Sequence, residues 1–167
     1  MAASLRLALA VLTLGFSAFA AHGHGDGKHD AGAKKNAIST EEYHWGREGD
    51  PRKVSRTIRV DMADTMRFNP DEVKVKRGDT VKFVVRNTGK LRHEMVIGTQ
   101  KELENHAELM KKHPGMEHDA PYMAHVPPGG KQEIVWTFTK PGTFMYGCLL
   151  PGHWEAGMKA SIVVAAN

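Results

Sequence analysis

The sequence predicts an all-β domain, a sandwich or a barrel, interrupted by one partly helical segment. Apolar and polar residues alternate in 57–62 and again in 73–76, as they do in half-buried strands. Turn-forming residues such as Arg77-Gly78-Asp79 separate these stretches. Short strands therefore recur about every 8–12 residues, a spacing typical of a sandwich or barrel and not of alternating strands and helices.

The remaining strands follow from the same signals. The turns are expected at Phe68-Asn69-Pro70-Asp71, Asn87-Thr88-Gly89 and Lys140-Pro141-Gly142. In chain order, we expect strands at residues 57–62, 73–76, 80–85, 94–97, 134–138, 143–146 and 158–164.

An insert at about residues 99–126 breaks the strand pattern. Between Thr99 and His113 the arrangement is compatible with a helix, and it is carried by Glu102, Leu103, Ala107, Leu109 and Met110. The helix is expected to stop at Pro114-Gly115.

The N-terminal residues 1–20 have the layout of a secretory signal peptide. Arg6 precedes a short apolar stretch, and Ala18-Phe19-Ala20 is a small-x-small cleavage pattern. Residues 21–53 are poor in aliphatic side chains, so we expect a flexible, His-rich leader. We therefore expect a folded domain at 54–167, exported most simply to a bacterial periplasm.

Composition excludes several classes of protein. The 167 residues include one cysteine, so an intramolecular disulfide is impossible and a disulfide-stapled mini-protein or Cys-rich zinc ribbon is excluded. The net charge of +4 does not suggest a nucleic-acid partner. After the signal, no apolar run approaches membrane length, so we expect a mature protein without a membrane span, and a monomer.

The cysteine lies in a loop rich in metal-binding side chains. Cys148 is followed by His153 and then by Met158, and Pro151, Gly152 and Gly157 allow the loop to fold tightly. One thiolate, imidazoles and a weak thioether form the donor set of copper sites that transfer electrons. A second imidazole must come from another strand, and His93 is best placed to supply it.

Other interpretations of this loop use fewer of its residues. Cys148 alone could be a buried, inert thiol, the commonest fate of a free cysteine. A Cys–His nucleophile would leave Met158 and His93 unused. Zinc is a poorer match, because thioether is a poor ligand for zinc and structural zinc sites contain more thiolates.

At these residues the chain resembles the cupredoxins, the small blue or green copper proteins. The resemblance covers about residues 56–164 and is carried by Phe68-Asn69-Pro70, residues 81–87, His93 and the Cys148-x4-His153-x4-Met158 loop. The spacings are most similar to those of rusticyanin, and the His-rich leader and the insert resemble those of periplasmic copper-resistance cupredoxins. The resemblance implies an eight-stranded Greek-key sandwich with one type 1 copper held by His93, Cys148, His153 and Met158.

One position departs from the family pattern. Plastocyanin and azurin have Asn directly after their first ligand histidine, where it supports the Cys loop. Here that residue is Glu94, a departure that bears on the colour and potential of the site.

The insert holds a second group of candidate ligands. His106, Met110 and His113 follow i, i+4, i+7 spacing and share one helix face. The full set of candidates for a second, weakly bound copper is His106, Met110, His113, Met116, His118, Met123 and His125. The alternative is a solvated helix whose methionines pack on the sandwich.

Two functions follow from this reading, neither of them enzymatic. One is copper handling or resistance, favoured by the surplus of His and Met; the other is electron transfer between respiratory redox proteins. The expected partner is accordingly a redox protein or a copper-trafficking protein.

Overall fold

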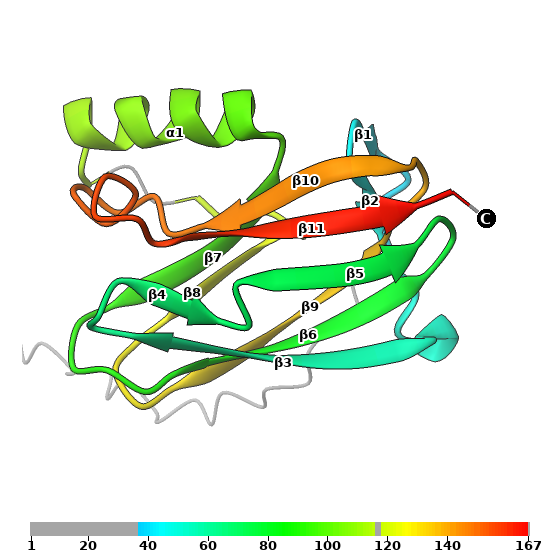
Figure 1. Ribbon diagram of the computed structural model, residues 1–167, viewed down its shortest axis with the longest axis horizontal. Coiled ribbons are helices and arrows are strands. Elements are labelled where there is room, and N and C mark those ends of the chain that lie inside the picture. Colours follow the sequence, from blue (N-terminus) through cyan, green and yellow to red (C-terminus); the bar gives the residue numbers. More distant parts are fainter. Residues whose placement is uncertain (1–36, 116–117, 167) are drawn as a thin grey trace, which may run out of the picture. The chain divides into compact units, whose positions relative to one another are not determined.

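The computed structural model describes residues 37–115 and 118–166, so the expected signal peptide and residues 21–36 of the expected leader lie outside the described residues. The described residues form two β-sheets, one α-helix and one short 3-10 helix, η1 (Pro51–Lys53) (Figure 1). Of the described helices, none is long and apolar enough to cross a membrane.

The first sheet has six strands in the order β1-β2-β9-β6-β3-β4. All neighbours in it are antiparallel except β3 and β6, which run parallel. Its strands are β1 (Glu42–Tyr43), β2 (Gly46–Glu48), β3 (Arg56–Ala63), β4 (Arg67–Asn69), β6 (Thr80–Asn87) and β9 (Lys131–Thr137).

The second sheet has five strands in the order β5-β11-β10-β7-β8. Here β5 and β11 run parallel, and the other pairs are antiparallel. Its strands are β5 (Glu72–Lys76), β7 (His93–Gly98), β8 (Met123–Val126), β10 (Gly142–Gly147) and β11 (Lys159–Ala165).

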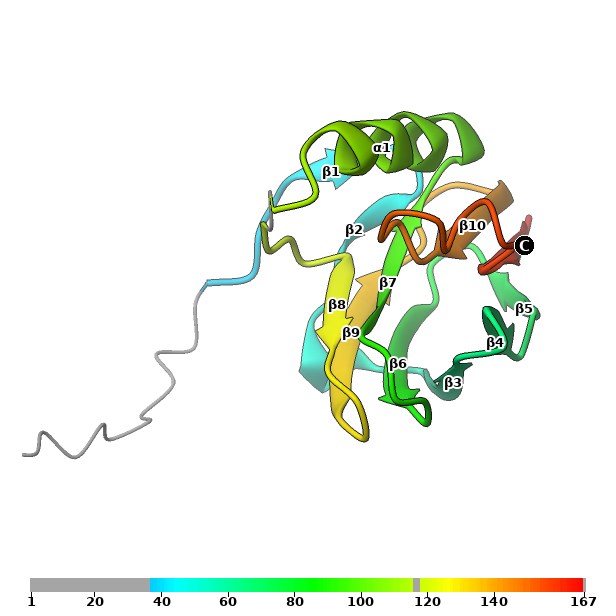
Figure 2. The same ribbon diagram turned by 90° about the vertical axis from the view of Figure 1, so that its left-hand side faces the viewer.

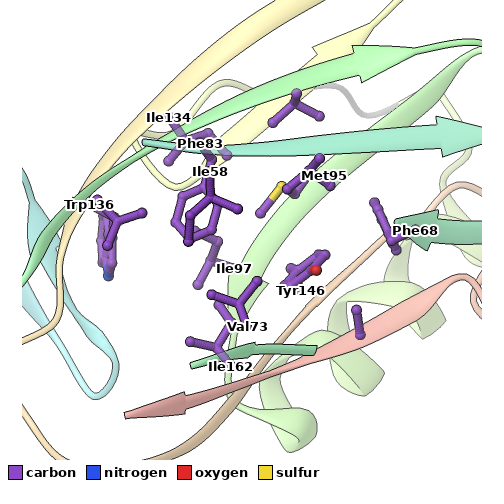
Figure 3. Packing of buried hydrophobic residues seen from close by; sticks show 14 of the residues in the cluster. Ile58, Phe68, Val73, Phe83, Met95, Ile97, Ile134, Trp136, Tyr146 and Ile162 are labelled. Atoms are coloured by element: carbon purple, nitrogen blue, oxygen red, sulfur yellow. The ribbon is translucent and has the colours of Figure 1, made fainter. Parts of the chain in front are cut away.

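The core lies between the two sheets. Strand β6 contributes Val81, Phe83 and Val85, the alternate residues expected from its period-two pattern, and all three are fully buried. They meet Ile97 and Tyr146 of the second sheet in one continuous cluster (Figure 3). Two sheets that pack on one shared core confirm the predicted all-β sandwich.

Helix α1 (Gln100–Lys112) covers part of the second sheet, beside β7 and β10 (Figure 2). It begins with a capping box, in which the Thr99 hydroxyl accepts from the backbone N–H of Glu102 and the Glu102 carboxylate accepts from that of Thr99. Its buried face, Leu103, Ala107 and Met110, packs in a second apolar cluster with Leu149 and Trp154. The helix was predicted at these residues.

One detail of the predicted organisation is wrong. Residues 42–53 do not belong to a flexible leader: they form β1, β2 and η1, because Trp45 is buried in the core and β2 pairs with β9. The insert ends in a strand, β8, which pairs with β7. With the short β1, β2 and β4, the described residues contain eleven strands, and the other eight agree with the expected number.

Candidate metal centre

The loop between β10 and β11, residues 148–158, is here called the copper loop. The backbone N–H of Cys148 donates to the carbonyl of Met158 (3.0 Å), and the N–H of Met158 donates to the carbonyl of His153 (3.0 Å). Gly152 and Gly157 adopt φ values of +86° and +94°, which favour glycine. These bonds and turns close the loop and bring its three predicted ligands to one end of the sandwich.

Cys148 is fully buried at the start of the loop. Its Sγ lies 3.2 Å from Nδ1 of His153 and accepts from the backbone N–H of Glu94 at 3.5 Å. Burial raises the pKa of the Cys148 thiol to about 12, so the metal-free thiol keeps its proton at neutral pH. A bound metal replaces that proton, since the thiolate is the ligand form.

His93 begins β7 and is also fully buried. Its Nε2 lies 3.0 Å from Oδ1 of Asp64, whose carboxylate accepts from the backbone N–H groups of Lys90 and Leu91. These contacts lower the pKa of Asp64 and keep it an anion. Nδ1 of His93 is buried without a hydrogen-bond partner among the described residues. A buried nitrogen without a partner is costly unless something binds it.

The three side chains converge in a way that suits copper. One ligand atom each of His93, Cys148 and His153 lie within 4.8 Å of one another, the one such group in residues 37–115 and 118–166. The two imidazole rings are 5.0 Å apart between centroids. His153 is partly exposed; burial, with the nearby His93, lowers its pKa and favours the neutral imidazole that binds metal. One thiolate and two imidazoles are the equatorial donors of an electron-transfer copper site.

Met158 is the last residue of the copper loop and is fully buried in the cluster that contains Cys148. Its backbone bonds to Cys148 and His153 hold it beside two of the three converging residues. Its role as the weak fourth ligand remains a prediction from the sequence.

Apolar residues seal this end of the sandwich. Leu149 is fully buried and Trp154 nearly so, as expected for residues that exclude water from the site. Met95, two residues after His93, is buried in the core.

Glu94 takes over the support of the copper loop. Its side chain is 2% exposed, and its Oε1 accepts from the backbone N–H of Leu149 at 2.9 Å. Its Oε2 lies 3.0 Å from Nδ1 of His125. The departure from the family's Asn therefore preserves a contact to the Cys loop and adds a link to β8.

The sequence did not point to Asp64 or to the pairing of Glu94 with His125. Asp64 lies 29 residues before His93 in a turn, and no spacing pattern connects them. Glu94 was singled out only by its position after His93.

The structure divides the candidates of the insert. Met110 and Met123 pack in the apolar cluster under α1, and His113 is an exposed C-cap residue. Met116 lies outside the described residues. The remaining candidates come near one another: His106 and His118 stack at 5.1 Å, and Nε2 of His125 lies 3.0 Å from the carbonyl oxygen of His118.

A two-sheet sandwich with one buried cysteine and two histidines at its end defines a mononuclear copper-binding domain. Comparison with known proteins agrees: residues 54–165 match the copper binding proteins, plastocyanin/azurin family. The chain is 47% identical to the copper-resistant cuproprotein CopI of Rubrivivax gelatinosus, over 85% of this chain and 84% of that protein. It is 37% identical to CopI of Vibrio cholerae, over 66% of each. Auracyanin from Roseiflexus castenholzii has a similar fold, with a TM-score of 0.58 and 24% identity over 67% of this chain and 98% of its own.

The chain therefore belongs to the plastocyanin/azurin family of copper-binding proteins, the cupredoxins. This confirms the resemblance stated from the sequence, and copper as the cofactor. The family match begins at residue 54, whereas the first sheet extends upstream of it through β1 and β2.

Proposed function

We propose that this protein is an exported cupredoxin that handles copper and protects the cell from it, and that it is not an enzyme. The observation that carries the proposal is the converging group of His93, Cys148 and His153, in which Nδ1 of His93 has no hydrogen-bond partner among the described residues. The relatives named copper-resistant cuproprotein support the resistance role. The signal-like residues 1–20 support export to the periplasm.

Each residue has a distinct role in the proposal. Cys148 would hold copper through its thiolate and carry the electron, His93 and His153 would bind it through imidazole nitrogens, and Met158 would supply a weak thioether ligand. Bound copper supplies one-electron chemistry between Cu(I) and Cu(II). Asp64 orients His93 through Nε2, and this leaves Nδ1 for the metal.

The second candidate function is electron transfer between redox proteins. It is favoured by His153, which is partly exposed while His93 and Cys148 are buried. A redox or copper-trafficking partner would then approach at His153. The His-rich leader and the surplus of histidine and methionine in residues 106–125 favour copper handling over a dedicated carrier.

Spectroscopy and growth test the proposal separately. The copper-loaded protein should show an intense visible thiolate-to-Cu(II) absorption and a type 1 EPR signal, and Cys148→Ser should lack both while remaining folded. His44→Ala, an exposed histidine away from the loop, is the matched control and should keep both. A wild-type protein without the thiolate band would refute the copper site.

Deletion of the gene should lower the copper concentration at which the host stops growing. Complementation with the wild-type gene should restore tolerance, and Cys148→Ser should not. Unchanged tolerance after deletion would instead support the electron carrier.

A further inference from the structure

Three histidines from separate parts of the insert gather beside β7. His106 lies on α1, His118 lies between α1 and β8, and His125 lies on β8. The rings of His106 and His118 are stacked, with centroids 5.1 Å apart and planes at 29°. His125 joins them through Nε2, which is 3.0 Å from the carbonyl oxygen of His118.

His125 is oriented as metal-binding histidines are. Its Nδ1 contacts the buried Glu94 carboxylate at 3.0 Å, and its Nε2 contacts the backbone carbonyl oxygen of His118, so the ring is held from both sides and Nε2 must exchange that contact to bind a metal. A carboxylate on the far nitrogen of an imidazole is the usual support of a histidine that binds metal. Asp64 supports His93 in the same way at the first site.

The cluster is both compact and open to solvent. The pKa of His106 is lowered mainly by its burial, is raised by Glu94, and is lowered further by His118 and His125, so the four groups are close enough to sense one another's charge. His118 is exposed, and the exposed carboxylate of Asp119 lies 3.8 Å from Nε2 of His125. A metal ion could therefore arrive from solvent and find nitrogen donors with an oxygen donor beside them.

We propose that His106, His118 and His125 form a second copper site, which takes Cu(II). Imidazole and carboxylate donors without a thiolate suit Cu(II), which also binds such sites more tightly than the other divalent first-row metals. The donors differ from those of the Cys148 site, because none of these three residues carries sulfur, the donor that favours Cu(I).

The second site should be the weaker of the two. The three histidines do not bring their nitrogens within 4.8 Å of one another, as the ligands of the Cys148 site do, so the segment of His118 must adjust on binding. That adjustment costs free energy and makes the bound ion easier to exchange. Such a site is suited to collecting copper, and in this respect the inference extends the proposed copper-handling function.

Glu94 connects the two sites. Its Oε2 contacts His125, its Oε1 accepts from the N–H of Leu149, and its own N–H donates to Sγ of Cys148. A single residue of β7 thus contacts both sites.

The test is a titration of the full protein with Cu(II) after the Cys148 site has been filled with one equivalent. A competing chelator of known affinity gives the binding constant, and EPR reports a second Cu(II) signal that has no thiolate band. The variants are His118→Ala and the double variant His106→Ala/His118→Ala. The matched control is His113→Ala, another exposed histidine of the same insert. The leader histidines are identical in all of these proteins, so they contribute equally.

We expect the wild-type protein and His113→Ala to bind the second Cu(II) equally. His118→Ala should bind it at least 10-fold more weakly, and the double variant more weakly still. Because His118 is exposed, its variant should fold normally, which circular dichroism checks. Equal second-ion affinity in His118→Ala and His113→Ala, or no second ion in the wild type, would overturn the second site. Absence of the thiolate band from the copper-loaded wild type would instead refute the first site. Failure of the second site and failure of the first are therefore distinguishable.

Discussion

Glu94 is the residue at which the copper loop, β7 and β8 meet. Its carboxylate is almost fully buried, yet both of its oxygens have partners, the N–H of Leu149 and Nδ1 of His125. A buried carboxylate without such partners would be strongly unfavourable. The residue therefore acts on the copper ligands by holding the backbone next to Cys148.

Replacing Glu94 should separate its hydrogen bond from its charge. Glu94→Gln keeps an oxygen that accepts from the Leu149 N–H, so the type 1 absorption should stay close to that of the wild type. Glu94→Ala leaves this buried N–H without its acceptor and should lower the free energy of unfolding by about 1–3 kcal/mol. It should also shift the thiolate band. The measurements are urea unfolding and absorption of the copper-loaded proteins, and identical spectra for Ala and wild type would contradict the positioning role.

The buried thiol of Cys148 should make the metal-free protein less stable in alkali. Burial raises its pKa from 9.0 to about 12, so the unfolded chain loses this proton at a lower pH than the folded protein does. The stabilisation is complete below pH 9 and should fall by up to about 1.4 kcal/mol per pH unit above it.

Cys148→Ser isolates this effect, because the lysines and tyrosines titrate equally in both proteins. Urea unfolding of the reduced, metal-free proteins at several pH values between 7 and 11 gives the difference in stability. The wild type should lose stability relative to the variant only above pH 9. A constant difference across the range would mean that the thiol is not buried.

At the scale of elements, α1 and the copper loop support each other. Trp154 of the loop packs in the apolar cluster under α1, and Nζ of Lys111 lies 3.0 Å from Oε1 of Glu155. The last residue of β10, Gly147, leaves room for the Trp154 ring: a Cβ there would lie 2.5 Å from Cζ3 of the indole. The absence of a side chain at Gly147 thus allows Trp154 to close over the site.

Gly147→Ala should therefore displace Trp154 and disturb the neighbouring Cys148. Overpacking of this kind costs about 1–3 kcal/mol, and we expect faster loss of copper to a chelator. Gly115→Ala is the control, since a Cβ at that position meets nothing within 4 Å. Unfolding curves and the rate of copper release check both effects, and a Gly147→Ala protein that matches the control would show that Trp154 does not depend on this contact.

Elements with local signals could be predicted, and those that depend on distant pairing could not. The helix was predictable because Thr99 and Glu102 cap it and Pro114 follows it, all within a few residues. The loop ligands Cys148 and His153 share one short segment. The contacts of Asp64 with His93 and of Glu94 with Leu149 instead join residues 29 and 55 positions apart, and only the arrangement of the strands brings them together.

At the scale of the whole molecule, dependence on contacts between distant residues also explains why the ordered start of the domain was not predicted. Residues 37–53 contain few aliphatic side chains, and so their composition suggested a flexible chain. The segment is nevertheless ordered by aromatic packing: Trp45 stacks at 6.4 Å on Trp136 and meets Tyr43 and Tyr122 at 5.1 and 5.6 Å. The carbonyl of Trp45 also accepts from Nε1 of Trp136 at 3.0 Å. Average composition does not reveal that one tryptophan can hold a segment to the sandwich.

This arrangement predicts that stability and copper binding can be separated. Strands β1 and β2 lie at one end of the sandwich and the copper loop lies at the other (Figure 1). Trp45→Ala removes a side chain that is 5% exposed and should lower the free energy of unfolding by about 3–5 kcal/mol. The thiolate band of the folded protein should not change, since the copper loop lies at the other end of the sandwich (Figure 1). His44→Ala, the exposed neighbour, should change neither quantity. Urea unfolding followed by tryptophan fluorescence, together with the absorption of the copper-loaded protein, tests both expectations. A Trp45→Ala protein as stable as the wild type would show that packing of the upstream strands does not contribute to the stability of the domain.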